Sequence, residues 1–196
     1  LASGRDGLID VKELRSKLTN DVAALMLTNP NTLGLFERDI KAITALLHER
    51  DALVYMDGAN MNALLGIARP GDMGVDLLQL NLHKTFSTPH GGGGPGAGPV
   101  GVTKTLEPFL PVPRVRKRGR RFMWDERSRA TIGRVHSFYG NVGVLGRAFT
   151  YIRTLGREGL ERASRVAIIN ANYLRAKLEG TFPVPYDGHC MHEFVA

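Results

Sequence analysis

Short apolar runs and segments with helical periodicity alternate along the first half of the chain. Val22–Leu27 is apolar and ends at Asn29-Pro30-Asn31, and this length and breaker are typical of a buried strand. Apolar side chains at helical spacing predict an amphipathic helix over Leu35–Arg50. Strands that alternate with helices indicate an α/β fold with a largely parallel sheet and flanking helices. The same reasoning predicts a short helix from Asp10 to about Leu18 and strands at Leu53–Met56, Leu77–Leu82 and Pro99–Thr103.

The pattern changes in the last third of the chain. Tyr139–Gly156 and Glu158–Leu178 have the periodicity of helices, and a glycine break separates them. The final residues, 192–196, resemble a strand that is cut short. We therefore predict part of an α/β domain over residues 1–135, and linking helices with the start of a smaller α+β C-terminal domain over residues 136–196.

Cysteine content and hydropathy narrow the class of protein. Cys190 is the only cysteine, so no intrachain disulfide framework is possible, which fits bacterial cytoplasm or the mitochondrial matrix. No apolar run approaches the ~18–20 residues that span a bilayer, so we expect no membrane partner. The chain begins at Leu1 without an initiator Met or an apolar signal core, and we expect it to be a piece of a longer protein.

The net charge of +7 at pH 7 is concentrated in one segment. Residues 114–134 hold nine basic residues and two acids, Asp125 and Glu126, so this segment carries +7 and the rest of the chain is neutral. We predict a basic loop, which is usually a solvated face or a docking patch for an acidic partner. A basic RNA-binding module that uses Arg114–Arg121 is the alternative from another class, but the segment has no interleaved aromatic ladder for stacking bases.

Two residues at predicted strand ends suggest cofactor chemistry. Asp57 lies at the carboxyl end of one strand, where open α/β sheets bind ligands, and Lys84 lies just past the end of the next. A partly desolvated lysine can form a Schiff base, and a carboxylate can keep a pyridine nitrogen protonated. Taken alone the pair is weak evidence, because an Asp in this position is often a turn residue and a Lys usually faces solvent.

A glycine-rich run follows Lys84 and is flanked by histidines. Residues 91–94 are four consecutive glycines, whose backbone amides could approach a phosphate or a carboxylate closely, although a mobile surface linker explains them equally well. The run does not match the phosphate-loop pattern. His83 and His90 surround the candidate lysine, and two histidines in that position support a catalytic hypothesis.

Longer motifs around these residues resemble one family. The segments 28–37 (TNPNTLGLFE), 55–63 (YMDGANMNA), 80–86 (LNLHKTF) and 89–96 (PHGGGGPG) are similar to the P-protein of the glycine cleavage system, a glycine decarboxylase. Residues 132–135 (IGRV), 138–141 (FYGN) and 151–156 (YIRTLG) extend the resemblance over nearly the whole chain. The lysine motif joined to four glycines is the most specific of these matches.

The resemblance implies a fold and a set of site residues. The expected fold is the aspartate-aminotransferase-like type of pyridoxal-phosphate enzyme, which would make residues 1–135 part of the cofactor-binding domain. Lys84 would hold pyridoxal 5′-phosphate through a Schiff base, and Asp57 would pair with the ring nitrogen. His83 would help to hold the phosphate or the Schiff base. The further expected site residues are Ala59 near the ring, Thr28 and Asn29 near the ring hydroxyl, and His90, Gly91, Gly92, Gly93 and Gly94 around a very small substrate.

The resemblance also implies an activity and partners. The expected reaction is decarboxylation of glycine, with transfer of the aminomethyl group to the lipoyl arm of H-protein; the alternative is another decarboxylase or transferase of the same fold. The other P-protein subunit, or the missing half of the chain, would complete a dimer or heterotetramer. Only 56 residues precede Asp57, too few for the family's phosphate-binding helix start. We therefore expect residues 1–196 alone to bind the cofactor weakly and to be inactive.

Overall fold

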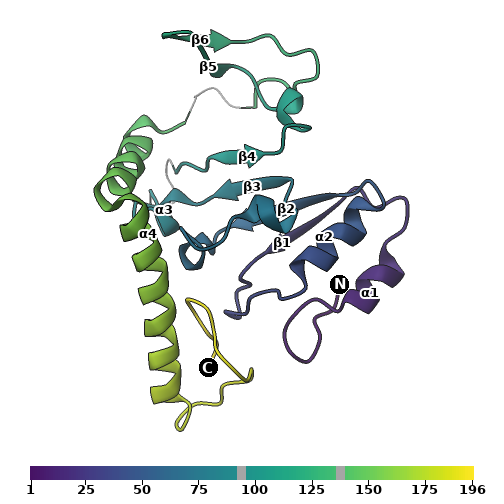
Figure 1. Cartoon of the computed structure of the whole chain (residues 1–196), viewed down its shortest axis with the longest axis vertical. Helices are drawn as coiled ribbons and strands as arrows, with labels where there is room; N and C mark the ends of the chain where they lie inside the picture. The colour runs from purple at the N-terminus through teal and green to yellow at the C-terminus, as the bar shows by residue number, and fades with distance from the viewer. Residues whose placement is uncertain (92–95, 136–139) are drawn as a thin grey trace.

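A four-stranded sheet forms the centre of the molecule in the computed structural model, which describes residues 1–91, 96–135 and 140–196 (Figure 1). Its order is β1-β2-β3-β4. The strands β1 (Ala24–Thr28), β2 (Leu53–Gly58) and β3 (Leu77–Leu80) are parallel, and β4 (Val100–Val102) is antiparallel to β3. The predicted largely parallel α/β sheet is confirmed, with strand bounds that differ from the prediction by a few residues.

The core lies on one face of this sheet. Val54 and Met56 of β2 are fully buried, whereas the alternate positions of the same strand are partly or fully exposed. Helix α2 (Ile40–His48) covers the buried face and contributes Ile43 and Leu47, neither of which is exposed to solvent. Because side chains alternate across a strand, Asp57 projects from the opposite, more open face.

Helix α2 is shorter than predicted because side chains upstream occupy the backbone amides of its expected first turns. Asn29 Oδ1 accepts a hydrogen bond from the amide of Glu37 at 2.9 Å, and Asn31 Oδ1 accepts one from Leu35 at 3.1 Å. Residues 35–39 therefore form a loop that is bonded to the end of β1. The other predicted N-terminal helix, α1 (Val11–Lys17), is present, and the Asp10 carboxylate caps its amides at Lys12 and Glu13.

Short helices connect the strands. The predicted strand that reaches Leu82 ends two residues earlier, because Leu82 begins a single helical turn, α3 (Leu82–Thr85). The connections also contain the 3₁₀ turns η1 (Met61–Ala63), η2 (Pro70–Met73) and η3 (Glu107–Phe109).

The basic segment is a β-hairpin, so its prediction as a loop was wrong. Strands β5 (Arg114–Arg118) and β6 (Arg121–Asp125) pair with each other and lie beyond β4 at the top of Figure 1. Phe122 and Trp124 lie two residues apart on β6 and are 71% and 55% exposed, which also corrects the expectation that the segment lacks interleaved aromatic side chains. Strand alternation was missed because four of the five residues of β5 are basic and three consecutive residues of β6 are apolar, so neither strand alternates apolar with polar positions.

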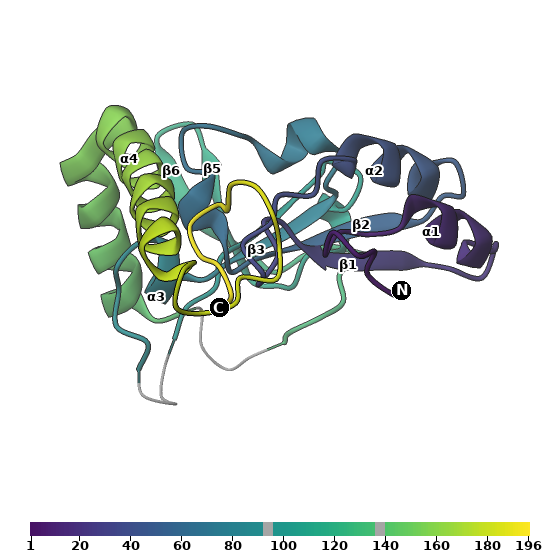
Figure 2. The ribbon, with the colours of Figure 1, turned by 90° about the horizontal axis from the view of Figure 1, so that it is seen from below.

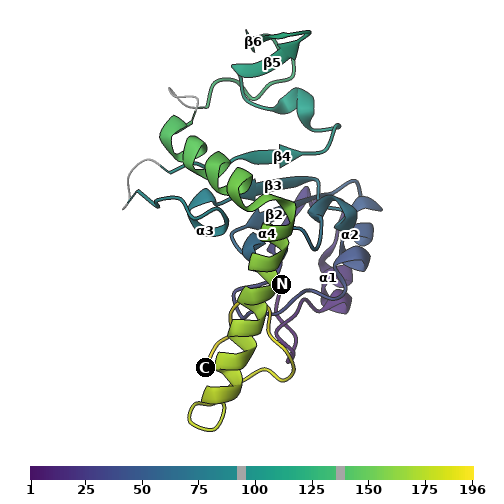
Figure 3. The ribbon, with the colours of Figure 1, turned by 60° about the vertical axis from the view of Figure 1, so that its left-hand side comes forward.

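The long C-terminal helix contains the predicted glycine break. Helix α4 (Val142–Leu178) is interrupted at Gly156, whose φ of 62° and ψ of −172° are not helical. Figure 3 shows that the two halves run in different directions. Tyr139, the first residue of the predicted helix, lies outside the described residues.

The last residues do not form the predicted strand. Residues 179–196 are irregular and return from the end of α4 towards the sheet, between α4 and the edge of the strands (Figure 2). The Met191 amide donates to the Gly34 carbonyl at 2.7 Å, a single backbone contact rather than a ladder. We refer to residues 190–194 as the C-terminal strap. No helix among the described residues is long and apolar enough to cross a membrane.

Gly34 is the position on which the strap depends, and this yields a first prediction. Gly34 has a φ of +79°, and a Cβ atom there would lie 1.7 Å from the Glu193 carbonyl oxygen. We expect Gly34→Ala to lower the free energy of unfolding by about 3 kcal/mol or more, because backbone must move. Gly71→Ala is the matched control, since a Cβ atom there meets nothing within 4 Å. Urea unfolding of the two variants provides the measurement, and equal stability would contradict the predicted clash.

Candidate active site

The carboxyl ends of the parallel strands bring the predicted residues together at one edge of the sheet. Thr28 is the register partner of Asp57, and Asp57 is the register partner of Gln79. Register partners in parallel strands project to the same face, so these three side chains form one row. This edge is where open α/β sheets bind their ligands.

The Asp57 carboxylate is held in place by two donors. Its Oδ1 accepts a hydrogen bond from the Ala59 amide at 2.9 Å and another from Gln79 Nε2 at 2.8 Å. Gln79 Nε2 also donates to Asn81 Oδ1 at 2.9 Å, at the residue that leads into α3. Both bonds go to Oδ1, so Oδ2 is free to accept from a ligand as far as the described residues show. Asp57 is half-buried, at the strand end that faces the proposed ligand.

Lys84 lies on α3, one strand away from Asp57. Leu82 and Phe86 anchor this turn by packing against Val144 and Ala148 of α4. Lys84 itself is exposed, and within the described ranges its ammonium has no ion pair or hydrogen bond. The amine is therefore available to a ligand at the same sheet edge as Asp57.

Two histidines lie beside the lysine, as predicted. The rings of His83 and His90 meet edge to face with centroids 4.4 Å apart. Desolvation lowers the pKa of His83, and the neighbouring His90 and Lys84 lower it further. His83 is therefore neutral at pH 7, with one ring nitrogen as a donor and the other as an acceptor.

Buried polar atoms without partners surround this edge. The described residues offer no hydrogen bond to His83 Nδ1, Thr85 Oγ1 or Thr88 Oγ1, although the two threonines are only 5% and 7% exposed. Asn29 Nδ2 also has no hydrogen-bond partner among the described residues, although Asn29 has no exposed surface. Because an unsatisfied buried polar atom costs about 1–3 kcal/mol, so many of them indicate polar groups of a ligand. A ring hydroxyl and a phosphate are groups that fit these donors.

Of the remaining predicted residues, the structure describes Ala59 and Gly91. Ala59 follows Asp57 at the strand end, is half-buried, and is tied to Asp57 through its amide. Gly91 has a φ of 88°, in the region that favours glycine. Gly92, Gly93 and Gly94 lie outside the described residues.

Sequence reasoning missed several contributors to this site. Gln79 is central because it orients Asp57, yet in the sequence it looks like an ordinary solvent-facing strand position. Thr85 and Thr88 were passed over because threonines are common in loops; their proximity to Lys84 was the available signal. His192, on the C-terminal strap, is near enough to Lys84 for the ammonium to lower the pKa of its imidazole. No sequence signal linked those two residues.

Comparisons with solved structures agree with the overall fold. An alanine–glyoxylate aminotransferase from Nostoc sp. superposes with a TM-score of 0.64, covering 95% of this chain and 49% of that one at 18% identity. A sphingosine-1-phosphate lyase from Burkholderia pseudomallei gives a TM-score of 0.62 over 89% of this chain and 39% of that one at 16% identity. At such identities the likeness concerns the fold alone. It confirms the predicted aspartate-aminotransferase-like fold.

Sequence comparisons reach further. Residues 1–94 match the family described as aminotransferase class-V. The chain is 57% identical over 195 residues to a probable glycine dehydrogenase (decarboxylating) subunit 2 of Fervidobacterium nodosum, covering 100% of this chain and 41% of the relative. It is 59% identical over 192 residues to the protein of the same name from Thermotoga maritima, covering 98% of this chain and 40% of the relative.

These similarities have two consequences. Together with the fold, they support pyridoxal phosphate as the cofactor. The chain spans about two fifths of the length of the curated relatives it matches. With 57–59% identity maintained along essentially its whole length, the chain is similar to about two fifths of glycine dehydrogenase (decarboxylating) subunit 2.

Proposed function

We propose that the enzyme of which this chain is a part decarboxylates glycine with pyridoxal phosphate and passes the aminomethyl group to the lipoyl arm of H-protein. The observation that carries the proposal is that Lys84 and Asp57 lie at the ends of adjacent strands, in segments that also hold buried polar atoms without partners among the described residues. The names of the relatives support glycine as the substrate. The designation "subunit 2" supports a companion subunit in the assembly.

Each residue of the site has a task in this reaction. Lys84 would hold the cofactor covalently. Asp57 Oδ2 would accept a hydrogen bond from the N–H of the protonated ring nitrogen, while Gln79 keeps the carboxylate in position. When bound, pyridoxal phosphate supplies an electron sink for the electron pair left by departing carbon dioxide. The negative charge of Asp57 stabilises the cationic ring that makes this sink effective.

The buried polar atoms would orient the cofactor. Asn29 Nδ2 can donate to the ring hydroxyl, and Thr28 lies in the same row as Asp57. The Thr85 and Thr88 hydroxyls and the His83 imidazole are placed to satisfy phosphate oxygens. His90 packs on the His83 ring and would fix its orientation.

The basic hairpin is the candidate docking surface for the carrier. Its register places Arg114, Arg116 and Arg118 on one face with Arg121. Arg116 is already paired with Asp125 and Glu107, but Arg118, Arg120 and Arg121 have no ion pair among the described residues. Unpaired exposed cations attract an acidic protein over the screening length of about 8–10 Å. We therefore assign the carrier contact to these three arginines.

Two other functions make different predictions. Another pyridoxal-phosphate decarboxylase or transferase would share Lys84 and Asp57 but would not release carbon dioxide from glycine in the presence of a lipoyl acceptor. An RNA-binding hairpin is favoured by the exposed Phe122 and Trp124, since aromatic rings stack on bases. Binding of single-stranded RNA that is lost in Trp124→Ala, without any effect of the same change on carrier binding, would support that function.

The covalent link to Lys84 is tested by trapping it. We expect borohydride reduction of the complete enzyme, followed by peptide mapping, to place a pyridoxyl group on Lys84. Lys84→Arg should abolish the label, and Lys104→Arg, which alters the next lysine along the chain, should leave it unchanged. A pyridoxyl group on Lys104 would contradict the assignment.

The role of Asp57 is tested by removing its carboxylate. We expect Asp57→Ala to lower kcat for glycine decarboxylation by about 10²-fold or more, because the ring nitrogen loses its counter-charge in a half-buried site. Asp72→Ala is the control, since that carboxylate is exposed and pairs with Arg69 on the surface. Normal turnover in Asp57→Ala would show that another group supports the ring.

The carrier surface is tested by neutralising charge. We expect the triple change Arg118→Gln, Arg120→Gln and Arg121→Gln to raise KM for the lipoyl carrier roughly 10-fold at low salt, and to leave KM for glycine unchanged. The effect should shrink as ionic strength rises. The control removes the same charge from α4, where Arg153, Arg157 and Arg162 are exposed. An identical response in both triple variants would mean that only net charge matters.

A further inference from the structure

The C-terminal strap is fixed between two parts of the molecule. On one side, the Met191 amide donates to Gly34, in the loop that follows Asn29 at the end of β1. On the other side, Asn172 of α4 binds the backbone of Cys190 twice. Asn172 Nδ2 donates to the Cys190 carbonyl at 2.7 Å, and the Cys190 amide donates to Asn172 Oδ1 at 3.1 Å. The strap therefore has a defined position at the edge of the sheet where the strands end.

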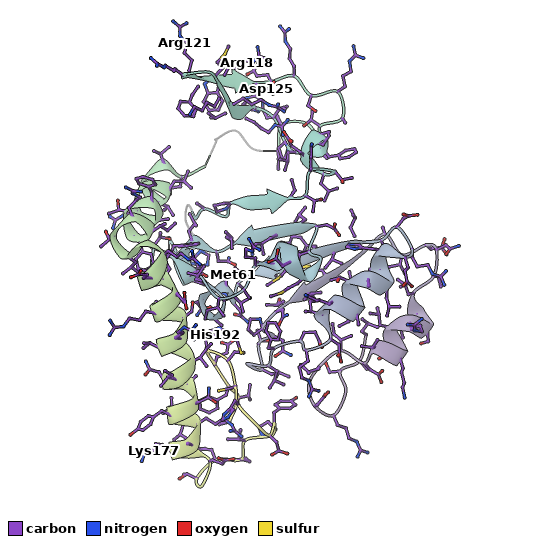
Figure 4. The ribbon with its side chains drawn as sticks, in the orientation of Figure 1. Met61, Arg118, Arg121, Asp125, Lys177 and His192 are labelled. Atoms are coloured by element: carbon purple, nitrogen blue, oxygen red, sulfur yellow. The ribbon has the colours of Figure 1, made fainter. Side chains whose placement is uncertain are left out.

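His192 is the residue that this arrangement buries. Figure 4 shows it beside α4, at the end of the strap nearest the sheet and below Met61. Its side chain is 7% exposed, and Nδ1 is buried without a hydrogen-bond partner among the described residues. By contrast, His189, three residues earlier on the same segment, is exposed. A buried ring nitrogen with no partner indicates a missing polar group.

Glu193 determines which ring nitrogen of His192 carries the proton. Its Oε1 lies 3.6 Å from His192 Nε2 and is itself buried without a hydrogen bond. A carboxylate facing Nε2 favours the tautomer that carries its proton there, which leaves a lone pair on Nδ1. The group that completes Nδ1 must then be a hydrogen-bond donor.

The electrostatics agree with a neutral ring next to an amine. Desolvation lowers the pKa of His192, the Lys84 ammonium lowers it further, and Glu193 opposes these two effects. The net direction is downward, so the imidazole is unprotonated at pH 7 and able to accept a proton. The lysine that would hold the cofactor is thus within electrostatic reach of a buried acceptor on a separate segment.

We infer that His192 is the proton acceptor for the primary ammonium group of the amino-acid substrate as it approaches Lys84. The proton leaves the substrate nitrogen for His192 Nδ1, which yields a neutral, nucleophilic amine and an imidazolium ion. Glu193 stabilises the imidazolium through Nε2, and the proton then passes from Nδ1 to solvent. The inference rests on Lys84 as the cofactor-binding lysine, which peptide mapping tests independently.

Methylamine is a suitable probe because it has a primary amine and no carboxylate. In the complete enzyme, the change in cofactor absorbance reports its reaction at the Lys84 linkage. We expect His192→Phe to slow this reaction roughly 10²-fold at pH 7, the scale of a lost general base, and Glu193→Gln to slow it less. The deficit of His192→Phe should shrink as pH rises towards the pKa of methylamine, where no base is needed. His189→Phe should behave like the unaltered enzyme.

Two further results separate proton transfer from a structural role. Imidazole in the buffer should restore part of the rate in His192→Gly, because it fits the space that the ring vacates. Independently of reactivity, the ¹⁵N spectrum of His192 in the cofactor-free enzyme should show a neutral ring protonated at Nε2. A charged ring, or one protonated at Nδ1, would overturn the inference. So would a deficit in His192→Phe that is the same at every pH, provided that Lys84 still carries the pyridoxyl label.

Discussion

The hydrogen bond between Gln79 and Asp57 depends on the parallel register of β2 and β3, and the rest of the site depends on it in turn. One residue of slippage would turn Asp57 to the opposite face, into the apolar core beneath α2. The register is enforced from that core, because Met56 and Leu78 are partners on the buried face. Packing on one side of the sheet thus determines where charge is placed on the other.

The buried polar atoms without hydrogen-bond partners at the candidate site lower the stability of the ligand-free protein. His83 and Thr85 lie on the turn α3, which Leu82 and Phe86 help to hold against α4, and Thr88 lies three residues after it. The same preorganisation that costs stability in the free chain favours binding, since donors that are already in place need not be ordered afterwards. The site is therefore a local exception to the rule that buried polar groups are paired, and it occurs where we propose that the cofactor binds.

Local signals predicted the strands, α1 and the break in α4, and short motifs identified Asp57 and Lys84. These features depend on neighbours within a few residues. The late start of α2 could not be predicted, because it depends on Asn29 and Asn31 side chains that compete for backbone amides. The basic hairpin was missed because β5 is almost entirely basic and β6 has three consecutive apolar residues, so neither strand alternates apolar with polar positions. The path of α4 and the strap brings His192 near enough to Lys84 for the ammonium to lower the pKa of its imidazole, and no pattern in the sequence predicts that proximity.

The break at Gly156 has a consequence for helical phase. In an uninterrupted α-helix each residue turns by about 100°, so the direction of Asn172 would be dictated by Val144 and Ala148, which are committed to α3. The non-helical φ and ψ of Gly156 release the second half from that phase. Asn172 can then face Cys190, while the first half keeps its own contacts. Because Gly156 breaks the helix, the first half of α4 can pack against α3 while the second half binds the C-terminal strap.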